Sequence, residues 1–186
     1  MISKQNIIPV ITSMKGLESF LLTPLKVFIL QDVHINHLNY IIKTAHEHNR
    51  EVIVHIELIQ GLANDEFGAQ FLIQQMHVDG VISSKPKIIE MTQKNHCLAI
   101  LRVFIMDSKS VKRSLQIIES TKPDIVEFLP SLIYEIFPDF IKDISAEVWA
   151  GGLVQNIFQI EAIFKTGINR ITVSNLELAV KNAKFE

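Results

Sequence analysis

Four ionisable side chains interrupt short runs of Val, Ile and Leu that are typical of buried β-strands: His55, Glu57, Arg102 and Glu127. Adjacent residues of a strand face opposite sides, so residues of one parity share a face. In the segment 51–58, the even positions are all Val, Ile or Leu, whereas His55 and Glu57 share the odd positions with Ile53. Buried charges are costly unless they are paired. An arginine, an imidazole and two carboxylates on one interior face therefore indicate either a satisfied polar layer or a ligand site.

A second chemical pattern lies at the ends of the last two apolar segments. Gly151 and Gly152 directly follow one segment, and Ser174 and Asn175 end the other, in which Thr172 and Ser174 share the inward parity. In a parallel α/β barrel, the loops after strands seven and eight bind phosphate through backbone N–H groups, and glycine permits that close approach. The sequence therefore predicts a small phosphorylated ligand whose hydroxyl groups meet the interior arginine and carboxylates.

The elements that must position these groups alternate along the whole chain. We expect eight strands, at Ile7–Ile11, Val27–Gln31, Glu51–Leu58, Gly80–Ser83, Leu98–Ile105, Ile125–Leu129, Val148–Ala150 and Ile171–Ser174. We expect eight helices, at Lys15–Leu22, Ile35–Glu47, Asp65–Gln75, Lys87–Asn95, Ser110–Ser120, Leu132–Ile144, Gln155–Lys165 and Leu176–Asn182. Such alternation predicts the α/β class, here a TIM-barrel-like (β/α)8 fold with short loops in one domain, 1–186. An open doubly wound parallel sheet is the alternative.

Local signals support several of these boundaries. Asn64 is expected to cap the third helix, with Asp65 and Glu66 as acids of its first turn. Ser110 is expected to begin the fifth helix after the turn at 107–109, and Gly167 to end the seventh.

Composition excludes several classes of protein. The chain is 48% hydrophobic and 20% charged with a formal charge of -2, and no apolar run approaches the ~20 residues of a membrane span. Residues 1–6 lack the pattern of a secretory signal, and the single cysteine, Cys97, cannot form an internal disulfide. We therefore expect a cytoplasmic protein whose cysteine is a buried or half-buried thiol and not a nucleophile.

Seven histidines raise the question of a metal site. His34 and His37 have a helical spacing, but no second cluster supplies the remaining ligands, and His46 and His48 face apart on a helix. No metal is predicted. His34 is interpreted as a residue of the site rim or as a hydrogen-bonding partner within its own loop.

Positive charge is concentrated in one part of the chain. The segment 85–122 has eight basic and three acidic residues, so it carries +5 and the remainder carries -7. If the fourth and fifth helices are neighbours, their basic residues could contact a nucleic-acid backbone; these are Lys87, Lys94, Lys109, Lys112 and Arg113. A solvated helix face is the alternative interpretation.

An enzyme is the competing class, because small phosphate-binding barrels are often isomerases, aldolases or lyases. Glu57 or Glu127 could act as a base in an isomerase or lyase of a small phosphorylated sugar. A Schiff-base aldolase needs a lysine inside a strand, and Lys85 comes nearest to that position.

Several segments, in order along the chain, resemble the glycerol-3-phosphate-responsive antiterminators that regulate glycerol uptake operons. They are Ile7-Ile8-Pro9, His55 to Leu62, Asn64 to Phe67, Asp79 to Lys85, Arg102 to Ser108, Lys122-Pro123-Asp124, Glu127 to Pro130, Ala150-Gly151-Gly152 and Val173-Ser174-Asn175. The resemblance implies a TIM-barrel-like fold, glycerol 3-phosphate as effector, and ligand-dependent binding to messenger leader RNA. It implies no catalytic residue and no cofactor besides the effector, and a homodimer is considered alongside the monomer.

Together with the two polar patterns, the resemblance implies ligand-binding residues at His55, Glu57, Asn64, Asp65, Ser83, Lys85, Arg102, Glu127, Gly151, Gly152, Ser174 and Asn175. The chain departs from the family's pattern at several positions. The family has Arg near Thr12-Ser13, Asp at Glu57, Gln at Leu101 and Gly at Ser131, and Ser84-Lys85 replaces its Thr-Arg. A lost guanidinium is not neutral for a phosphate contact.

Overall fold

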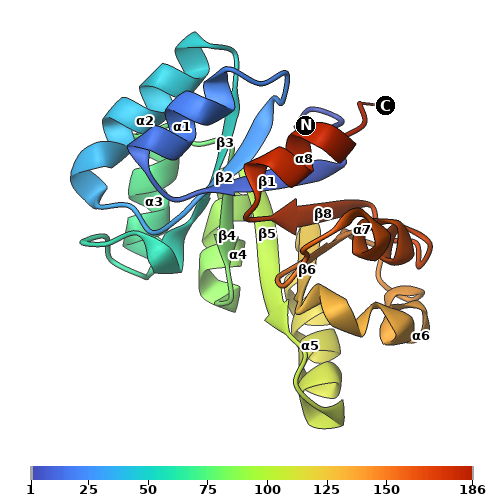
Figure 1. The fold of residues 1–186 in the computed structure, drawn as a ribbon. Coiled ribbons are helices and arrows are strands. Elements are labelled where there is room, and N and C mark those ends of the chain that lie inside the picture. Colours follow the sequence, from blue (N-terminus) through green and yellow to red (C-terminus); the bar gives the residue numbers. More distant parts are fainter. Residues whose placement is uncertain (1, 186) are drawn as a thin grey trace.

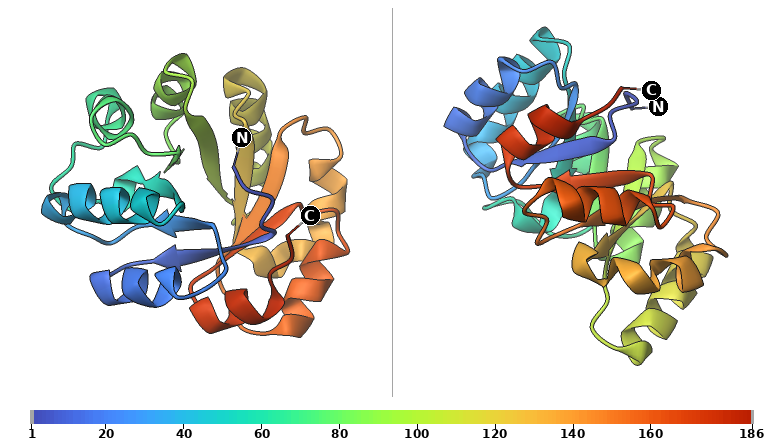
Figure 2. Two further views of the ribbon diagram at one scale, coloured as in Figure 1. Left: turned by 90° about the horizontal axis from the view of Figure 1, so that it is seen from above. Right: turned by 45° about the vertical axis from the view of Figure 1, so that its right-hand side comes forward.

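The computed structural model describes residues 2–185, without the side chain of Phe140. Eight parallel strands form a closed barrel in sequence order, surrounded by helices (Figures 1 and 2). The strands are β1 Ile7–Ile11, β2 Val27–Leu30, β3 Glu51–His55, β4 Gly80–Ser83, β5 Leu98–Phe104, β6 Ile125–Leu129, β7 Glu147–Gly151 and β8 Arg170–Val173. β8 pairs with β1 at Ile7↔Ile171, which closes the ring and excludes the open sheet.

The helices that follow the strands are α1 Met14–Leu21, α2 Ile35–Glu47, α3 Glu66–Gln74, α4 Pro86–Lys94, α5 Ser108–Thr121, α6 Phe137–Ile141, α7 Ile157–Phe164 and α8 Leu176–Asn182. Two 3-10 segments, η1 Ile56–Leu58 and η2 Ser131–Ile136, lie after β3 and β6. No helix in the described part of the chain is long and apolar enough to cross a membrane.

The core has two apolar layers, as the strand parities predict. Val52 and Val54 of β3 belong to the layer between the sheet and the helices, whereas Ile53 belongs to the barrel interior. The interior layer consists of large side chains, including Ile8, Val27, Ile29, Ile82, Ile100, Ile125 and Trp149. Arg102 and Glu127 continue the inward parity of Ile100 and Ile125 toward the carboxyl ends of the strands. The barrel interior is therefore apolar toward the amino ends of the strands and polar toward their carboxyl ends.

At the amino ends of the strands, one hydrogen-bond arrangement recurs. Before β4, β6 and β8, the last residue ahead of the strand has a side-chain oxygen that accepts a hydrogen bond. The donor is the second backbone N–H group of the strand that precedes it in the chain. Asp79 accepts from Val52 N at 2.7 Å, Asp124 from Ala99 N at 2.8 Å and Asn169 from Val148 N at 2.8 Å. The buried side chain of Gln5 similarly contacts Lys26 N and Val27 N. These contacts satisfy backbone donors at strand starts that would otherwise need water.

Two predictions of element bounds are wrong, each for a local reason. β3 ends at His55, because the chain turns into η1 and carries Glu57 out of the strand. The sixth helix is not one element from 132 to 144: η2 precedes α6, and Pro138 lies in the first turn of α6. Proline has no N–H and clashes with the carbonyl four residues earlier, so it begins a helix and does not continue one.

Two predicted helix caps are shifted. Asp65, not Asn64, caps α3 by accepting from Phe67 N and Gly68 N. Asp107 caps α5, which begins at Ser108, and Ser110 completes a capping box. Asp65 and Asp107 both have the extended backbone angles that are typical of helix caps.

Cys97 is partly buried, with its Sγ atom 3.5 Å from the carbonyl oxygen of Val78. Burial, aided by the nearby charge of Asp79, raises the pKa of the Cys97 thiol to about 11. The thiolate is the reactive form, so we expect a disulfide reagent at pH 8 to modify the folded protein on the order of 100-fold more slowly than the urea-unfolded chain. Equal rates for both states would contradict the buried position.

Candidate functional site

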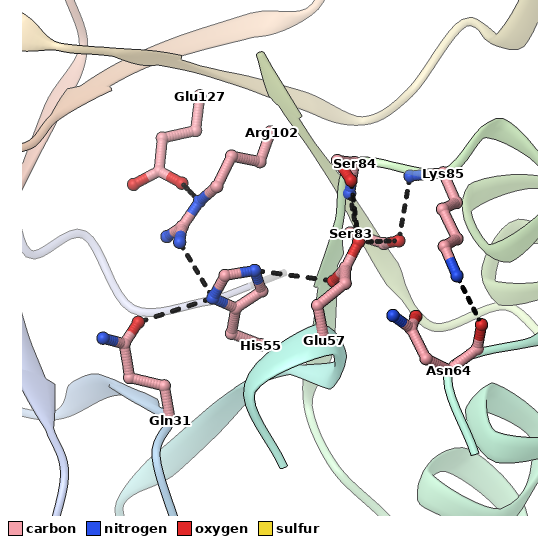
Figure 3. Close-up of polar contacts among 9 residues, drawn as sticks. All are labelled: Gln31, His55, Glu57, Asn64, Ser83, Ser84, Lys85, Arg102 and Glu127. Carbon is pink, nitrogen blue, oxygen red and sulfur yellow. Dashed lines mark hydrogen bonds and ion pairs between the residues drawn. The ribbon is translucent and has the colours of Figure 1, made fainter. Parts of the chain in front are cut away.

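A connected polar cluster occupies the carboxyl ends of five strands (Figure 3). Its members come from separate elements: Gln31 directly after β2, His55 at the end of β3, Ser83 at the end of β4, Arg102 in β5 and Glu127 in β6. Parallel strands bring these positions together, because all their carboxyl ends lie at the same mouth of the barrel.

The deepest part of the cluster is an ion pair inside the barrel. Arg102 Nε donates to Glu127 Oε2 at 2.7 Å, and Thr172 Oγ1 donates to Glu127 Oε1 at 2.6 Å. Glu127 is fully buried and Arg102 is 8% exposed. Gly151 makes this arrangement possible, because a Cβ atom there would lie 2.1 Å from Thr172 Oγ1 and 2.9 Å from Glu127 Oε1. Both carboxylate oxygens of Glu127 are therefore satisfied within the fold.

His55 connects this ion pair to a second carboxylate. Arg102 Nη1 lies 2.8 Å from His55 Nδ1, and an arginine can only donate, so Nδ1 accepts and the imidazole proton resides on Nε2. Burial, reinforced by the positive charge of Arg102, lowers the pKa of His55 to about 3. The imidazole is consequently neutral, with its Nε2 atom 3.4 Å from Glu57 Oε2.

Glu57 is the incomplete member of the cluster. Its Oε1 atom accepts from Ser83 Oγ at 2.7 Å, Ser84 N at 2.6 Å and Ser84 Oγ at 3.0 Å. Its Oε2 atom is buried and has no hydrogen-bond partner in the described structure, although His55 Nε2 lies 3.4 Å away. A buried acceptor without a donor is destabilising, so this oxygen is a position where a ligand hydroxyl would be stabilised.

Beside Arg102, a cavity of about 320 Å³ opens at the mouth. Its lining includes Arg102, Gly152, Thr172 and Ser174, so the loops after β7 and β8 meet the interior arginine as the sequence predicts. Gly152 has φ +79°, and the following Leu153 has φ +63°, a left-handed conformation that is uncommon for leucine. Strained backbone of this kind is concentrated at ligand sites.

Ser131, which stands where the family has glycine, contacts this same loop. Ser131 is fully buried, and its Oγ atom donates to the carbonyl oxygen of Gly152 at 2.6 Å. The hydroxyl therefore fixes the glycine loop. Leu101 packs in the apolar layer outside the barrel, and Ser13 caps α1 by accepting from Gly16 N.

Other predicted site residues have local roles outside this cavity. Asp65 caps α3, and Asn175 caps α8 by accepting from Leu178 N at 3.0 Å. Lys85 Nζ donates to the carbonyl oxygen of Asn64 at 2.7 Å, and Ser83 holds Glu57. Gln31 was not among the predicted site residues, yet it lines the cavity, and its Oε1 atom lies 3.4 Å from His55 Nδ1. A polar residue directly after an apolar strand was the available signal.

His34 is a hydrogen-bonding residue of its own loop, because its Nδ1 atom caps α2 by accepting from Asn36 N. Within residues 2–185, no group of three or more His, Cys, Asp and Glu side chains could hold a metal ion.

The predicted basic residues lie on two neighbouring helices, α4 and α5. Lys87 and Lys94 are exposed on α4, and Lys109, Lys112 and Arg113 are exposed on α5. Across the described residues, none of the five takes part in an ion pair.

Comparison with known proteins shows the family of this chain. A family model described as "Glycerol-3-phosphate responsive antiterminator" matches residues 7–179. The chain belongs to this antiterminator family. A glycerol uptake operon antiterminator regulatory protein from Listeria monocytogenes has a similar crystal structure, with a TM-score of 0.91 and 30% identity over 95% of this chain and 96% of that one. An antiterminator-related protein from Thermotoga maritima matches with a TM-score of 0.83 and 28% identity over 96% and 99%.

The antiterminator family is a regulatory one, and membership supports a regulatory role for this chain. Deoxyribose phosphate aldolase from Aeropyrum pernix has the same fold, with a TM-score of 0.71 but only 12% identity over 95% of this chain and 88% of that one. None of the eight described strands contains a lysine, so the chain lacks the strand lysine of a Schiff-base aldolase.

Proposed function

We propose that the protein binds glycerol 3-phosphate at the mouth of the barrel and that the bound form associates with messenger leader RNA to prevent premature termination. Membership of the antiterminator family supports the class of function. The observation that carries the ligand is the cavity in which Arg102, Gly152 and Ser174 meet, the combination of guanidinium, glycine backbone and hydroxyl that suits a phosphate.

The remaining polar groups suit the glycerol part of the ligand. Arg102 uses Nε and Nη1 for Glu127 and His55, and among the described residues no hydrogen bond involves Nη2. That nitrogen is available to a phosphate oxygen. Beyond His55, the unpartnered Oε2 atom of Glu57 can accept from a hydroxyl group. The ligand would therefore extend from the glycine loop past Arg102 toward Glu57.

A thermal unfolding experiment tests the ligand. A ligand that binds only the folded state stabilises it by about 2.7 kcal/mol at 100 times its Kd, which raises the midpoint by roughly 5 to 10 °C for a chain of this size. We expect this shift with glycerol 3-phosphate, a much smaller one with glycerol, and full recovery of the phosphate ester after incubation. No shift, or consumption of the ester, would contradict the proposed regulator.

Two substitutions at one position test where the phosphate lies. Gly152→Asp should abolish the shift, because a carboxylate would face the phosphate at the glycine loop. Gly152→Asn has a similar size, tolerates a positive φ and adds no charge, so it should retain part of the shift. Asn39→Asp, on an exposed part of α2, is the control for added charge. An undiminished shift in Gly152→Asp would move the phosphate elsewhere.

A further inference from the structure

A second cavity that Arg102 lines lies between the end of β5 and the first turns of α5. It has a volume of about 300 Å³. Its lining includes Ser84, Arg102, Phe104, Met106, Ser110 and Arg113. Arg102 therefore lines both this cavity and the one that contains Gly152 and Ser174.

The rim of this second cavity is apolar and exposed. Phe104, the last residue of β5, is 51% exposed, and Met106 in the following loop is 85% exposed. The buried residues of α5 are Ser114, Ile118 and Thr121, all beyond its first turn. The start of the helix therefore does not cover the aromatic ring, and the end of α5 that follows β5 projects beyond the ends of the strands (Figure 1). A partner that covered the ring would remove apolar surface from water.

The charge around this apolar rim is positive. Lys109, Lys112 and Arg113 are exposed on the first turns of α5. The nearest acid in sequence, Asp107, accepts from Ser110 N at 2.7 Å as the helix cap. Glu119 lies about two turns further along α5. An aromatic ring beside three cations suits a partner that has both flat π-faces and negative charges, which describes single-stranded nucleic acid.

We propose that the second cavity receives one unstacked base of single-stranded RNA, which stacks on Phe104 while its neighbouring phosphates contact Lys109, Lys112 and Arg113. This inference rests on the proposed function and adds the surface and the form of the RNA. A paired A-form helix does not fit this role, because its bases are stacked and its major groove is too narrow for side chains. The RNA therefore meets the ligand at Arg102, the residue that the two cavities share.

The shared arginine also gives a physical basis for coupling between ligand binding and RNA binding. Arg102 lines both cavities, so a ligand phosphate that holds Arg102 in place also acts on the wall of the RNA cavity. If the ligand tightens RNA binding by some factor, RNA must tighten ligand binding by the same factor. The factor by which RNA changes the affinity for glycerol 3-phosphate, measured by titration with and without RNA, should equal the factor by which glycerol 3-phosphate changes the affinity for RNA.

The main test measures fluorescence anisotropy of short labelled oligouridine and oligoadenosine with saturating glycerol 3-phosphate. Phe104→Ala should weaken binding about 5- to 150-fold, because stacking of one base on an aromatic ring contributes ~1 to 3 kcal/mol, and Phe104→Trp should restore it. Phe158→Ala is the matched control, since Phe158 is 78% exposed on α7. The ligand-induced thermal shift should persist in each variant and shows that it is folded.

The salt dependence tests the phosphate contacts. The double variant Lys112→Glu and Arg113→Glu should reduce the slope of log K against log salt by about 2, as expected for two lost phosphate contacts. Lys142→Glu with Lys165→Glu, two exposed residues that flank α6 and α7, should leave the slope unchanged.

Crosslinking gives a measurement that does not depend on substitution. Trypsin releases residues 103–109 as one peptide, and this peptide contains Phe104 and Met106. RNA with 4-thiouridine should crosslink to it. Crosslinks confined to other peptides, or full RNA affinity in Phe104→Ala, would overturn this surface and leave the proposed function intact. No RNA binding by the wild-type protein, with a normal thermal shift, would overturn this inference and the RNA part of the proposed function.

Discussion

Replacing Arg102 with Met is expected to lower the free energy of unfolding by about 3 to 5 kcal/mol, because it leaves a buried carboxylate without its counter-charge. Glu127 is fully buried, and its Oε2 atom accepts from Arg102 Nε at 2.7 Å. Methionine fills most of the volume of the arginine stem. The loss of stability therefore comes mainly from the missing positive charge and not from a cavity. Urea unfolding at neutral pH measures the difference.

The double variant Arg102→Met with Glu127→Gln separates the charge from packing. A glutamine at 127 is uncharged and can still accept from Thr172, so we expect it to recover a substantial part of the lost stability. Lys43→Met is the control, because the Lys43–Glu47 pair is exposed and 3.9 Å long and should contribute less than ~1 kcal/mol. If Arg102→Met unfolded with the wild-type midpoint, the inward orientation of Arg102 would be wrong.

His55 should make the protein less stable as the pH falls below 6.5. Burial and the charge of Arg102 lower the pKa of His55 from 6.5 to about 3 in the folded state. Between these two values the unfolded chain binds a proton that the folded protein does not, so acid favours unfolding. Each pH unit corresponds to about 1.4 kcal/mol, which amounts to roughly 3 kcal/mol at pH 4 and is complete only near pH 3.

The comparison with His55→Gln isolates this contribution. Glutamine can accept from Arg102 but does not titrate, so the stability advantage of the wild-type protein should shrink by about 1.4 kcal/mol per pH unit below 6.5. The carboxylates titrate in both proteins and cancel in the difference. His37→Gln, at an exposed position of α2, should follow the wild-type curve. A constant difference between pH 7 and pH 4 would show that His55 is solvated.

The alternation of strands and helices predicts the closed barrel correctly because each strand is short, apolar and flanked by a periodic segment. Parity in β3, β5 and β6 identifies which side chains enter the barrel, and the Arg102–Glu127 pair follows from it. Parity fails where a strand ends early. Glu57 has left β3 for a 3-10 turn, yet it reaches the same cluster because Ser83 and Ser84 hold its carboxylate.

Three-dimensional contacts explain the rest of what the sequence could not reveal. Gly151 and Gly152 form one motif in the sequence, but the first allows a close approach of Thr172 and Glu127, whereas the second supplies a left-handed backbone at the cavity. Ser131 is a departure in the sequence and a support of the glycine loop in space. The second cavity that Arg102 lines depends on where α5 lies, which no local pattern specifies.

The side-chain bonds at the amino ends of the strands have a consequence for how this barrel could be re-engineered. Asp79, Asp124 and Asn169 each tie an even-numbered strand to its predecessor, without any residue of the mouth. The register of β3 with β4, β5 with β6 and β7 with β8 is thus supported from the opposite end of the molecule. Loops that follow the strands can be lengthened or exchanged for those of another barrel while the register is maintained. This chain is therefore a compact scaffold for grafting new binding loops, provided that those three side chains remain.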